Sequence, residues 1–148
     1  MTPQDLARIH ALCFEAPRPW SAAEFTGFLS SARVFLLTEP GGFLMGRVIV
    51  DEAEILTLAV DPPYRRQGCA TRLVAAFLAE AAQRGASSAF LEVSAANAAA
   101  QGLYRAAGFC ESGRRPSYYT RTDGTAEDAI LMTAGLAGRI AAPGSQKI

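Results

Sequence analysis

The stretch Arg65-Arg66-Gln67-Gly68-Cys69-Ala70 has the residue types of an anion-binding turn. It lies where an expected strand gives way to an expected helix. The first N–H groups of a helix have no partner inside it, and the helix dipole adds partial positive charge there. Gly68 lets the backbone approach a bulky anion, and small Cys69 and Ala70 leave the first turn uncrowded. A pyrophosphate would fit, although an ordinary strand-to-helix connection explains these residues equally well.

Glu92 is a side chain that could move a proton. Glu92 interrupts the apolar run Ala89–Val93, and a carboxylate in a buried strand is costly unless it is paired or used. Alternation along a strand could instead place Glu92 on a partly open face. Tyr104 lies in the C-terminal part of an expected helix. Without further information, a core aromatic residue beside Leu103 is the simpler interpretation of Tyr104.

Other common chemistries find little support in this chain. It contains neither G-x-x-x-x-G-K-[ST] nor G-x-G-x-x-G, the motifs typical of nucleotide hydrolysis and dinucleotide binding. The one histidine, His10, lies in an amphipathic helical pattern and is expected on the helix surface, which leaves little for a histidine-based triad. The three cysteines lack C-x-x-C spacing, so neither a disulfide framework nor a metal site is predicted.

The elements around the anion-binding turn follow from apolar spacing. Alternation predicts a strand over 55–60, which must stop at Asp61-Pro62-Pro63 because the prolines remove ladder donors. A helix follows and ends at Gly85. Its apolar face is spaced i, i+3, i+4, i+7: Ala70, Leu73, Val74, Phe77, Leu78 and Ala81.

The remaining pattern predicts an α/β (α+β) fold. Strands are expected over 34–38 and 43–50, forming an antiparallel meander with 55–60, then over 89–93, 109–113 and 129–132. A helix over about 98–107 would begin at Asn97 as its N-cap and end at Gly108. Tyr118 and Tyr119 would lie in a polar loop between the last two strands. The acids Asp51, Glu52 and Glu54 are most simply a solvated hairpin tip, or else attract a basic acceptor.

Two helices are predicted before the first strand. Thr2 and Pro3 begin one, with Leu6, Ile9, Leu12 and Cys13 on its buried face. Ser21 and Glu24 form a capping box for the second, which would turn Phe25, Phe28 and Leu29 inward. Trp20 precedes the cap, where a hydrophobic staple is commoner than a substrate contact.

Composition bounds the function. The 148 residues are half apolar and carry no net formal charge, so the chain is expected to form one domain over 1–148 and not to bind nucleic acid. It contains no run of about 18 apolar residues, so no membrane span is predicted. Together with the cysteine pattern, this favours a reducing cytoplasm. The Ala- and Gly-rich tail after about 134 is expected to be disordered.

Ordered motifs through most of the chain resemble the GNAT acetyltransferases. Arg65-x-x-Gly68-x-Ala70 after Leu58-Ala59-Val60-Asp61-Pro62 is similar to their acyl-CoA signature. Within that superfamily, further stretches resemble the ribosomal-protein alanine N-acetyltransferase (RimI) group: Pro19-Trp20-Ser21, Leu91-Glu92-Val93, Asn97-Ala98-Ala99-Ala100, Leu103-Tyr104, Gly108-Phe109, Tyr118-Tyr119 and Glu127-Asp128-Ala129-Ile130.

The resemblance implies a fold and a site. The fold would be a central, mostly antiparallel mixed sheet with about four helices, its first strand short or missing. Glu92 would be the base and Tyr104 the acid, without a metal. Trp20, Tyr118 and Tyr119 would line the acceptor side. Acetyl-CoA would bind the backbone of Leu58, Ala59 and Val60, the N–H groups of Arg66, Gln67, Gly68, Cys69, Ala70 and Thr71, and Asn97.

Three departures from the group's pattern lie near the acceptor side. Ser94 stands where the group usually has arginine, Ala96 where serine is common, and Ser117 where asparagine is common. They leave three classes open: an acetyltransferase of ribosomal-protein N-termini, one of small amines, and a non-catalytic acyl-CoA-binding module. Retention of Glu92 and Tyr104 argues against the last. The enzyme is expected to be a monomer or weak dimer.

Overall fold

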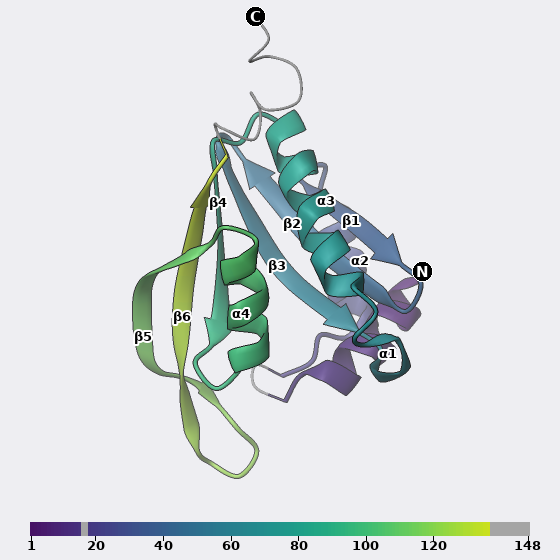
Figure 1. Cartoon of the computed structure of the whole chain (residues 1–148). Coiled ribbons are helices and arrows are strands. Elements are labelled where there is room, and N and C mark those ends of the chain that lie inside the picture. The colour runs from purple at the N-terminus through teal and green to yellow at the C-terminus, as the bar shows by residue number, and fades with distance from the viewer. Residues whose placement is uncertain (16–17, 137–148) are drawn as a thin grey trace, which may run out of the picture.

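The computed structural model describes residues 1–15 and 18–136, which form one six-stranded sheet and four α-helices (Figure 1). The strand order is β1-β2-β3-β4-β6-β5. The elements are α1 (Pro3–Cys13), α2 (Ala22–Leu29), β1 (Val34–Glu39), β2 (Gly42–Ile49), β3 (Glu52–Val60), the 3₁₀ turn η1 (Pro62–Tyr64), α3 (Cys69–Gln83), β4 (Ser88–Ser94), α4 (Ala98–Ala106), β5 (Cys110–Thr120) and β6 (Ala126–Gly135).

The sheet is mixed and mostly antiparallel, as predicted. Strands β1, β2 and β3 form the expected meander, and β6 pairs antiparallel with both β4 and β5. Only β3 and β4 are parallel, joined by the crossover helix α3. No strand precedes α1 in the described part of the chain, which agrees with the expectation of a short or missing first strand.

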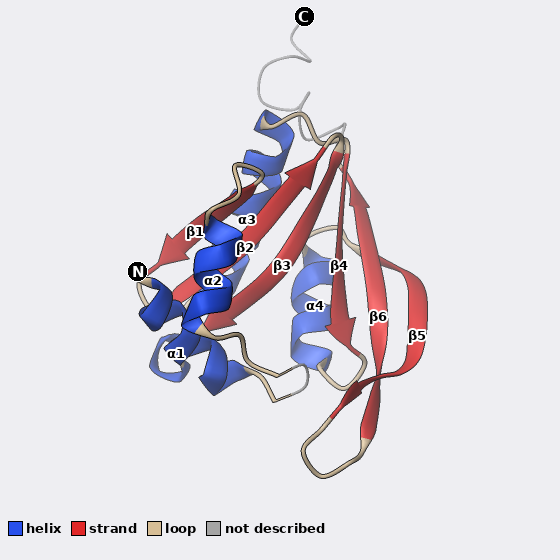
Figure 2. Cartoon of the chain, turned by 180° about the vertical axis from the view of Figure 1, so that it is seen from behind, coloured by secondary structure: helices blue, strands red, loops and turns tan. Residues whose placement is uncertain are grey.

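The two central strands are joined at one end only. Pairing between β3 and β4 is confined to Glu52–Glu54 against Ser88–Phe90. Beyond these residues the strands diverge toward the lower edge of the sheet (Figure 2). The polar backbone groups along the β4-facing edge of β3, from Ile55 onward, are therefore not used by a neighbouring strand.

Helices cover both faces of the sheet. Figure 1 shows α3 and α4 on one face, and Figure 2 shows α1 and α2 on the other. The larger core lies under α3 and includes the predicted face Leu73, Val74, Phe77, Leu78 and Ala81. A smaller cluster lies under α1 and α2: Leu6, Ile9, Phe25, Val34, Phe43, Met45 and Ala59. No helix among the described residues has the length and apolarity to span a membrane.

The predicted helix ends are confirmed. Thr2 and Ser21 both form capping boxes, the latter with Glu24, and Gly85 has a positive φ of 91° just after α3. The Trp20 ring packs 5.4 Å from Phe25, four residues beyond the cap, which is the geometry of a hydrophobic staple.

Two predictions for α1 are wrong. Leu12 is 53% exposed and does not belong to the buried face. His10, expected on the surface, is only 2% exposed, because the rings of Phe14, Trp20 and Phe25 surround it. Apolar spacing could not place a histidine inside, since it treats the ring as polar.

The last two strands are longer than predicted. Tyr118 and Tyr119 do not lie in a loop: β5 continues to Thr120, through a register shift between Arg115 and Tyr119. The tail prediction starts too early, because β6 continues to Gly135 and Leu136 is buried. The rest of the predicted tail, 137–148, lies outside the described residues.

Candidate active site

A cavity of about 890 Å³ lies between the diverging halves of β3 and β4. It brings together ten of the residues predicted for the site: Trp20, Leu58, Ala59, Val60, Ala70, Glu92, Asn97, Tyr104, Tyr118 and Tyr119. The predicted residues 66–69 and 71 do not line it. Most of these are exposed at the N-terminal end of α3, beside the cavity residues Arg65 and Ala70.

The turn before α3 presents a set of unused hydrogen-bond donors. Gly68 is the N-cap with φ of 78°, and Arg66 also has a positive φ of 63°. Within the described residues, none of the backbone N–H groups from Arg66 to Thr71 donates a hydrogen bond, and the first helical bond is Arg72 N to Gly68 O, 3.0 Å. Six donors at a helix N-terminus suit an anion with several oxygens, such as a pyrophosphate.

Cys69 plays a different part from its neighbours. Its side chain is buried against Gly42, where even one added carbon would lie 2.5 Å from Sγ. Burial raises the pKa of the Cys69 thiol, which keeps it protonated. Cys69 therefore anchors the turn to β2 and can offer a ligand only its backbone N–H.

The exposed edge of β3 offers alternate residues to the cavity. The N–H of Asp61 bonds back to Gly41 O at 2.7 Å, so the alternation of an antiparallel strand directs the peptide groups of Ala59 toward β2. Those of Leu58 and Val60 face the cavity. The Val60 carbonyl already accepts from Arg65 Nε at 3.2 Å and from Cys13 Sγ at 3.4 Å. Of the three predicted residues, Leu58 thus has both backbone groups unused among the described residues, and Val60 has its N–H.

Glu92 lies on the wall formed by β4. Arg115 Nε is 3.1 Å from its Oε2, yet this enclosed oxygen accepts no hydrogen bond within the described part of the chain. An enclosed carboxylate oxygen with a nearby cation but no donor retains its capacity to accept a proton or a hydrogen bond. Sequence reasoning found Glu92 but missed Arg115, which comes from the unexpected extension of β5.

Tyr104 lies on α4 and lines the same cavity as Glu92. Its ring is buried and packs edge-on against Phe109, with ring centroids 5.9 Å apart. Burial raises the pKa of the Tyr104 phenol, so the hydroxyl is protonated at neutral pH. It makes no hydrogen bond to any described residue. The packing and proton-donor interpretations of Tyr104 are therefore compatible.

Three aromatic side chains also line the cavity: Trp20, Tyr118 and Tyr119. Tyr119 is half-buried, and burial followed by the charge of Glu92 raises the pKa of its phenol to about 12. Tyr118 packs edge-on against it at 5.2 Å and is half exposed. Trp20 stacks on Phe28, with ring centroids 4.8 Å apart. Trp20 is thus both a staple and a cavity residue.

His10 and Thr57 were missed as members of this lining. Nδ1 of His10 accepts from the Trp20 N–H at 3.0 Å, and Nε2 lies 2.9 Å from Thr57 Oγ1. Because Nδ1 is an acceptor, Nε2 carries the proton and donates to the threonine. Burial lowers the pKa of His10 to about 4, which keeps the ring neutral.

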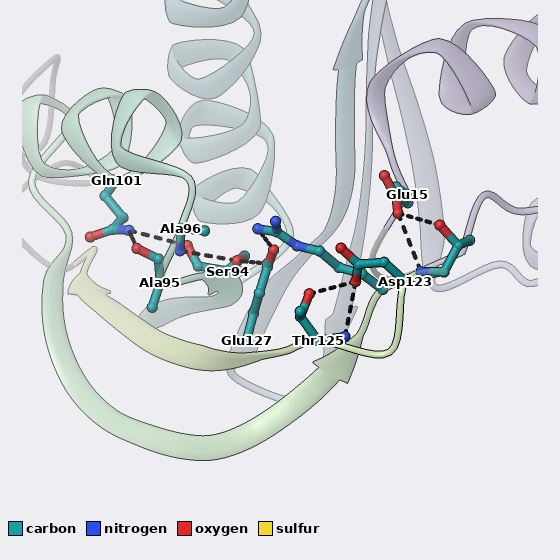
Figure 3. A network of polar contacts seen from close by, with 10 residues as sticks. Glu15, Ser94, Ala95, Ala96, Gln101, Asp123, Thr125 and Glu127 are labelled. Carbon is teal, nitrogen blue, oxygen red and sulfur yellow. Dashed lines mark hydrogen bonds and ion pairs between the residues drawn. The ribbon is translucent and has the colours of Figure 1, made fainter.

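A polar network at the end of β4 was also missed (Figure 3). Ser94 Oγ donates to Glu127, which forms an ion pair with Arg121, and both Glu127 and Arg121 line the cavity. Nearby, Thr122 donates to Glu15 through its N–H at 3.2 Å and its hydroxyl at 2.7 Å. The bonds between Thr122 and Glu15 join the β5–β6 hairpin to the segment after α1.

Asn97 and Glu54, for each of which the sequence left two roles possible, also line the cavity. Asn97 Oδ1 accepts from Ala100 N at 3.0 Å, so Asn97 caps α4 and borders the cavity. Of the three hairpin acids, only Glu54 lines the cavity, and Arg47 pairs with it at 2.7 Å. The residues described contain no group of three or more His, Cys, Asp or Glu able to hold a metal ion.

Comparison with known proteins agrees with this geometry. Residues 4–109 match the acetyltransferase (GNAT) family. The chain is 42% identical over 118 residues to the [ribosomal protein bS18]-alanine N-acetyltransferase of Escherichia coli K12, covering 77% of this chain and 79% of that protein.

Solved structures show the same fold. The crystal structure of the ribosomal-protein-S18-alanine N-acetyltransferase from Escherichia coli superposes with a TM-score of 0.78 at 36% identity, over 90% of this chain and 87% of that one. Arabidopsis thaliana NAA60, solved in complex with acetyl-CoA, superposes with a TM-score of 0.77 at 19% identity, over 92% and 96% of the chains, and so shows the fold alone. The chain belongs to the acetyltransferase (GNAT) family.

Proposed function

We propose that this protein moves the acetyl group of acetyl-CoA to the N-terminal α-amine of a protein, and that this amine belongs to the N-terminal alanine of a small-subunit ribosomal protein. One observation carries the proposal: the carboxylate of Glu92 and the phenol of Tyr104 line a single cavity that opens beside unused backbone donors of α3. The similarity to the bS18-alanine enzyme supports the choice of acceptor.

The chain has groups that suit acetyl-CoA. The N–H groups of residues 66–71 would hold the pyrophosphate, with Gly68 allowing close approach. The backbone of Leu58 and Val60 would hold the pantetheine arm, and Arg65 would first have to release the Val60 carbonyl. Asn97 borders the same cavity and would contact the cosubstrate further along. When bound, acetyl-CoA supplies an activated thioester, so the protein needs no covalent nucleophile.

Glu92 and Tyr104 would then each transfer one proton. Glu92 has an enclosed oxygen that accepts no hydrogen bond, so it can take a proton from the incoming ammonium, directly or through water. Tyr104 keeps its proton at neutral pH because burial raises its pKa, and it can donate that proton to the departing sulfur. The base lies on β4 and the acid on α4, at different walls of the cavity.

The acceptor end of the cavity suits an extended peptide. Trp20, Tyr118 and Tyr119 offer flat surfaces for a backbone, and Glu127 with Arg121 offers a paired charge. An α-amine has a pKa near 8 and lysine near 10.4, so at neutral pH about a tenth of the former but under about a thousandth of the latter is free base. One carboxylate therefore suffices for an α-amine. A ribosomal acceptor would place the reaction in the cytoplasm.

A thiol-release assay with acetyl-CoA tests this proposal. Hexapeptides beginning with Ala, Ser or Gly should react faster than N-blocked, lysine-containing counterparts. The panel should include polyamines, aminoglycosides and amino acids, because the departures at Ser94, Ala96 and Ser117 keep a small-amine acceptor as the second candidate. A polyamine that outcompetes the hexapeptides would refute the peptide acceptor. Binding of acetyl-CoA without turnover on any amine would favour a non-catalytic module.

A further inference from the structure

Gln101 is a buried polar side chain that does not line the cavity. It lies on α4, is 8% exposed, and its amide nitrogen donates to two carbonyls, Ser94 O at 3.1 Å and Ala95 O at 3.0 Å. Both carbonyls belong to the chain that leaves β4 (Figure 3). An amide nitrogen has two hydrogens, so both are used.

These two bonds join the segments that carry the acid and the base. Gln101 and Tyr104 are three residues apart on α4 and so lie on one side of the helix. Ser94 and Glu92 are two residues apart on β4 and so lie on one face of the strand. A shift of α4 along β4 would change the separation of Glu92 and Tyr104 and would break the Gln101 bonds.

The chain at the end of β4 is also hydrogen-bonded to residues of β6. Ser94 Oγ accepts from Ala96 N at 3.1 Å and donates to Glu127, which Arg121 also contacts. Ala95 N donates to Asp128 O at 2.9 Å. The end of β4 is therefore fixed to β6, and Gln101 transmits this fixed position to α4.

We propose that Gln101 is a positioning residue that sets Tyr104 relative to Glu92 through its bonds to the Ser94 and Ala95 carbonyls. The inference rests on the proposed function for the identity of the acid and base. Loss of the amide would remove the Gln101 donor from the Ala95 carbonyl and leave the Ser94 carbonyl with the Asn97 N–H, at 3.0 Å, and would let α4 move. Misplacement by about 1 Å can cost on the order of 100-fold in rate.

The test compares Gln101→Leu with two control variants. Val48→Ala removes core volume on β2, away from the cavity lining, and controls for lost stability. Ser87→Ala removes a side-chain bond to Asp51 O at the other end of β4. We expect kcat to fall about 10- to 100-fold in Gln101→Leu, with KM for acetyl-CoA within about twofold of wild type. Both controls should keep wild-type kcat below their melting temperatures.

A double variant separates positioning from a general loss of structure. If Gln101 acts through Tyr104, Gln101→Leu should cost less than about twofold when added to Tyr104→Phe. Fully additive losses, or wild-type kcat in Gln101→Leu, would overturn the inference. Gln101→Met, which is unbranched, replaces Gln101→Leu if the latter does not fold. Wild-type protein that acetylates a polyamine and not the hexapeptides would refute the proposed function alone, because the same cycle can be run with that amine.

Discussion

Substitution of Gly68 by valine should weaken acetyl-CoA binding without a comparable loss of folding. Gly68 is the N-cap of α3 with φ of 78°, a conformation that a β-branched residue adopts only at a cost. The added carbon would lie 2.8 Å from Nη1 of Arg72, the far end of a flexible side chain that can move aside if it gives up its bond to Gln67 O. The main strain is therefore in the backbone, at the turn whose six N–H groups are unused.

The size of the effect follows from these donors. Left-handed conformation costs a β-branched residue about 1–2 kcal/mol, and the turn can relieve that strain only by re-aiming its N–H groups. Hydrogen bonds to a charged partner contribute about 1.5–3 kcal/mol each. Loss of two such bonds predicts about 3 kcal/mol or more, which is about a 100-fold rise in the dissociation constant at 1.4 kcal/mol per tenfold.

Gly85 provides a matched control. It lies beyond the other end of α3 with φ of 91°, and a side chain there would meet nothing within 4 Å. Gly85→Val carries similar backbone strain but is far from the proposed pyrophosphate site. Calorimetry should show wild-type acetyl-CoA affinity in Gly85→Val and a large loss in Gly68→Val. Equal affinities in the two variants would place the cosubstrate elsewhere.

Three further predictions concern proton-bearing groups. Tyr104→Phe should lower kcat by about 10²- to 10⁴-fold with little change in acetyl-CoA affinity, and a loss below about threefold in a chemistry-limited assay would leave Tyr104 a packing residue. Glu92→Gln should lose most rate at low pH, where more of the amine is protonated, so a pH-independent loss would argue against a base. His10, whose pKa burial lowers from 6.5 to about 4, favours the folded state above pH 6.5. That stability should fade as the pH falls from 6.5 to 4; a melting-temperature curve equally steep in His10→Leu would contradict the assignment.

The sequence was most informative where local rules determine structure. The N-cap at Thr2, the capping box at Ser21, the staple at Trp20 and the glycine after α3 depend on residues a few positions apart, and all were confirmed. Strand lengths at the end of the chain were not predictable in this way. The segment 114–120 contains Pro116 and alternates poorly, yet β5 bridges it through a register shift against β6.

His10 shows why part of the cavity lining could not be predicted. Its neutral ring is buried because two partners from distant positions, Trp20 N–H and Thr57 Oγ1, satisfy both nitrogens. Neither partner is signalled by apolar spacing, since one is a backbone group and the other lies on β3. The sequence did show one histidine four residues before Phe14, in an amphipathic helical pattern. That spacing does not tell whether the histidine is buried or exposed.

Gln101 illustrates the same limit for the acid–base pair. Residue patterns alone left the roles of Glu92 and Tyr104 open, and the resemblance to the RimI group predicted them as base and acid. The separation of the two depends on how α4 lies against β4. Gln101 on α4 donates hydrogen bonds to the carbonyls of Ser94 and Ala95 at the end of β4, and any residue at those two positions would supply such carbonyls. Because the acceptors are backbone atoms, a sequence motif could include the glutamine but could not identify its two partners. The geometry of the pair is therefore a tertiary property, and substitution of Gln101 should affect it while both proton-bearing side chains remain in place.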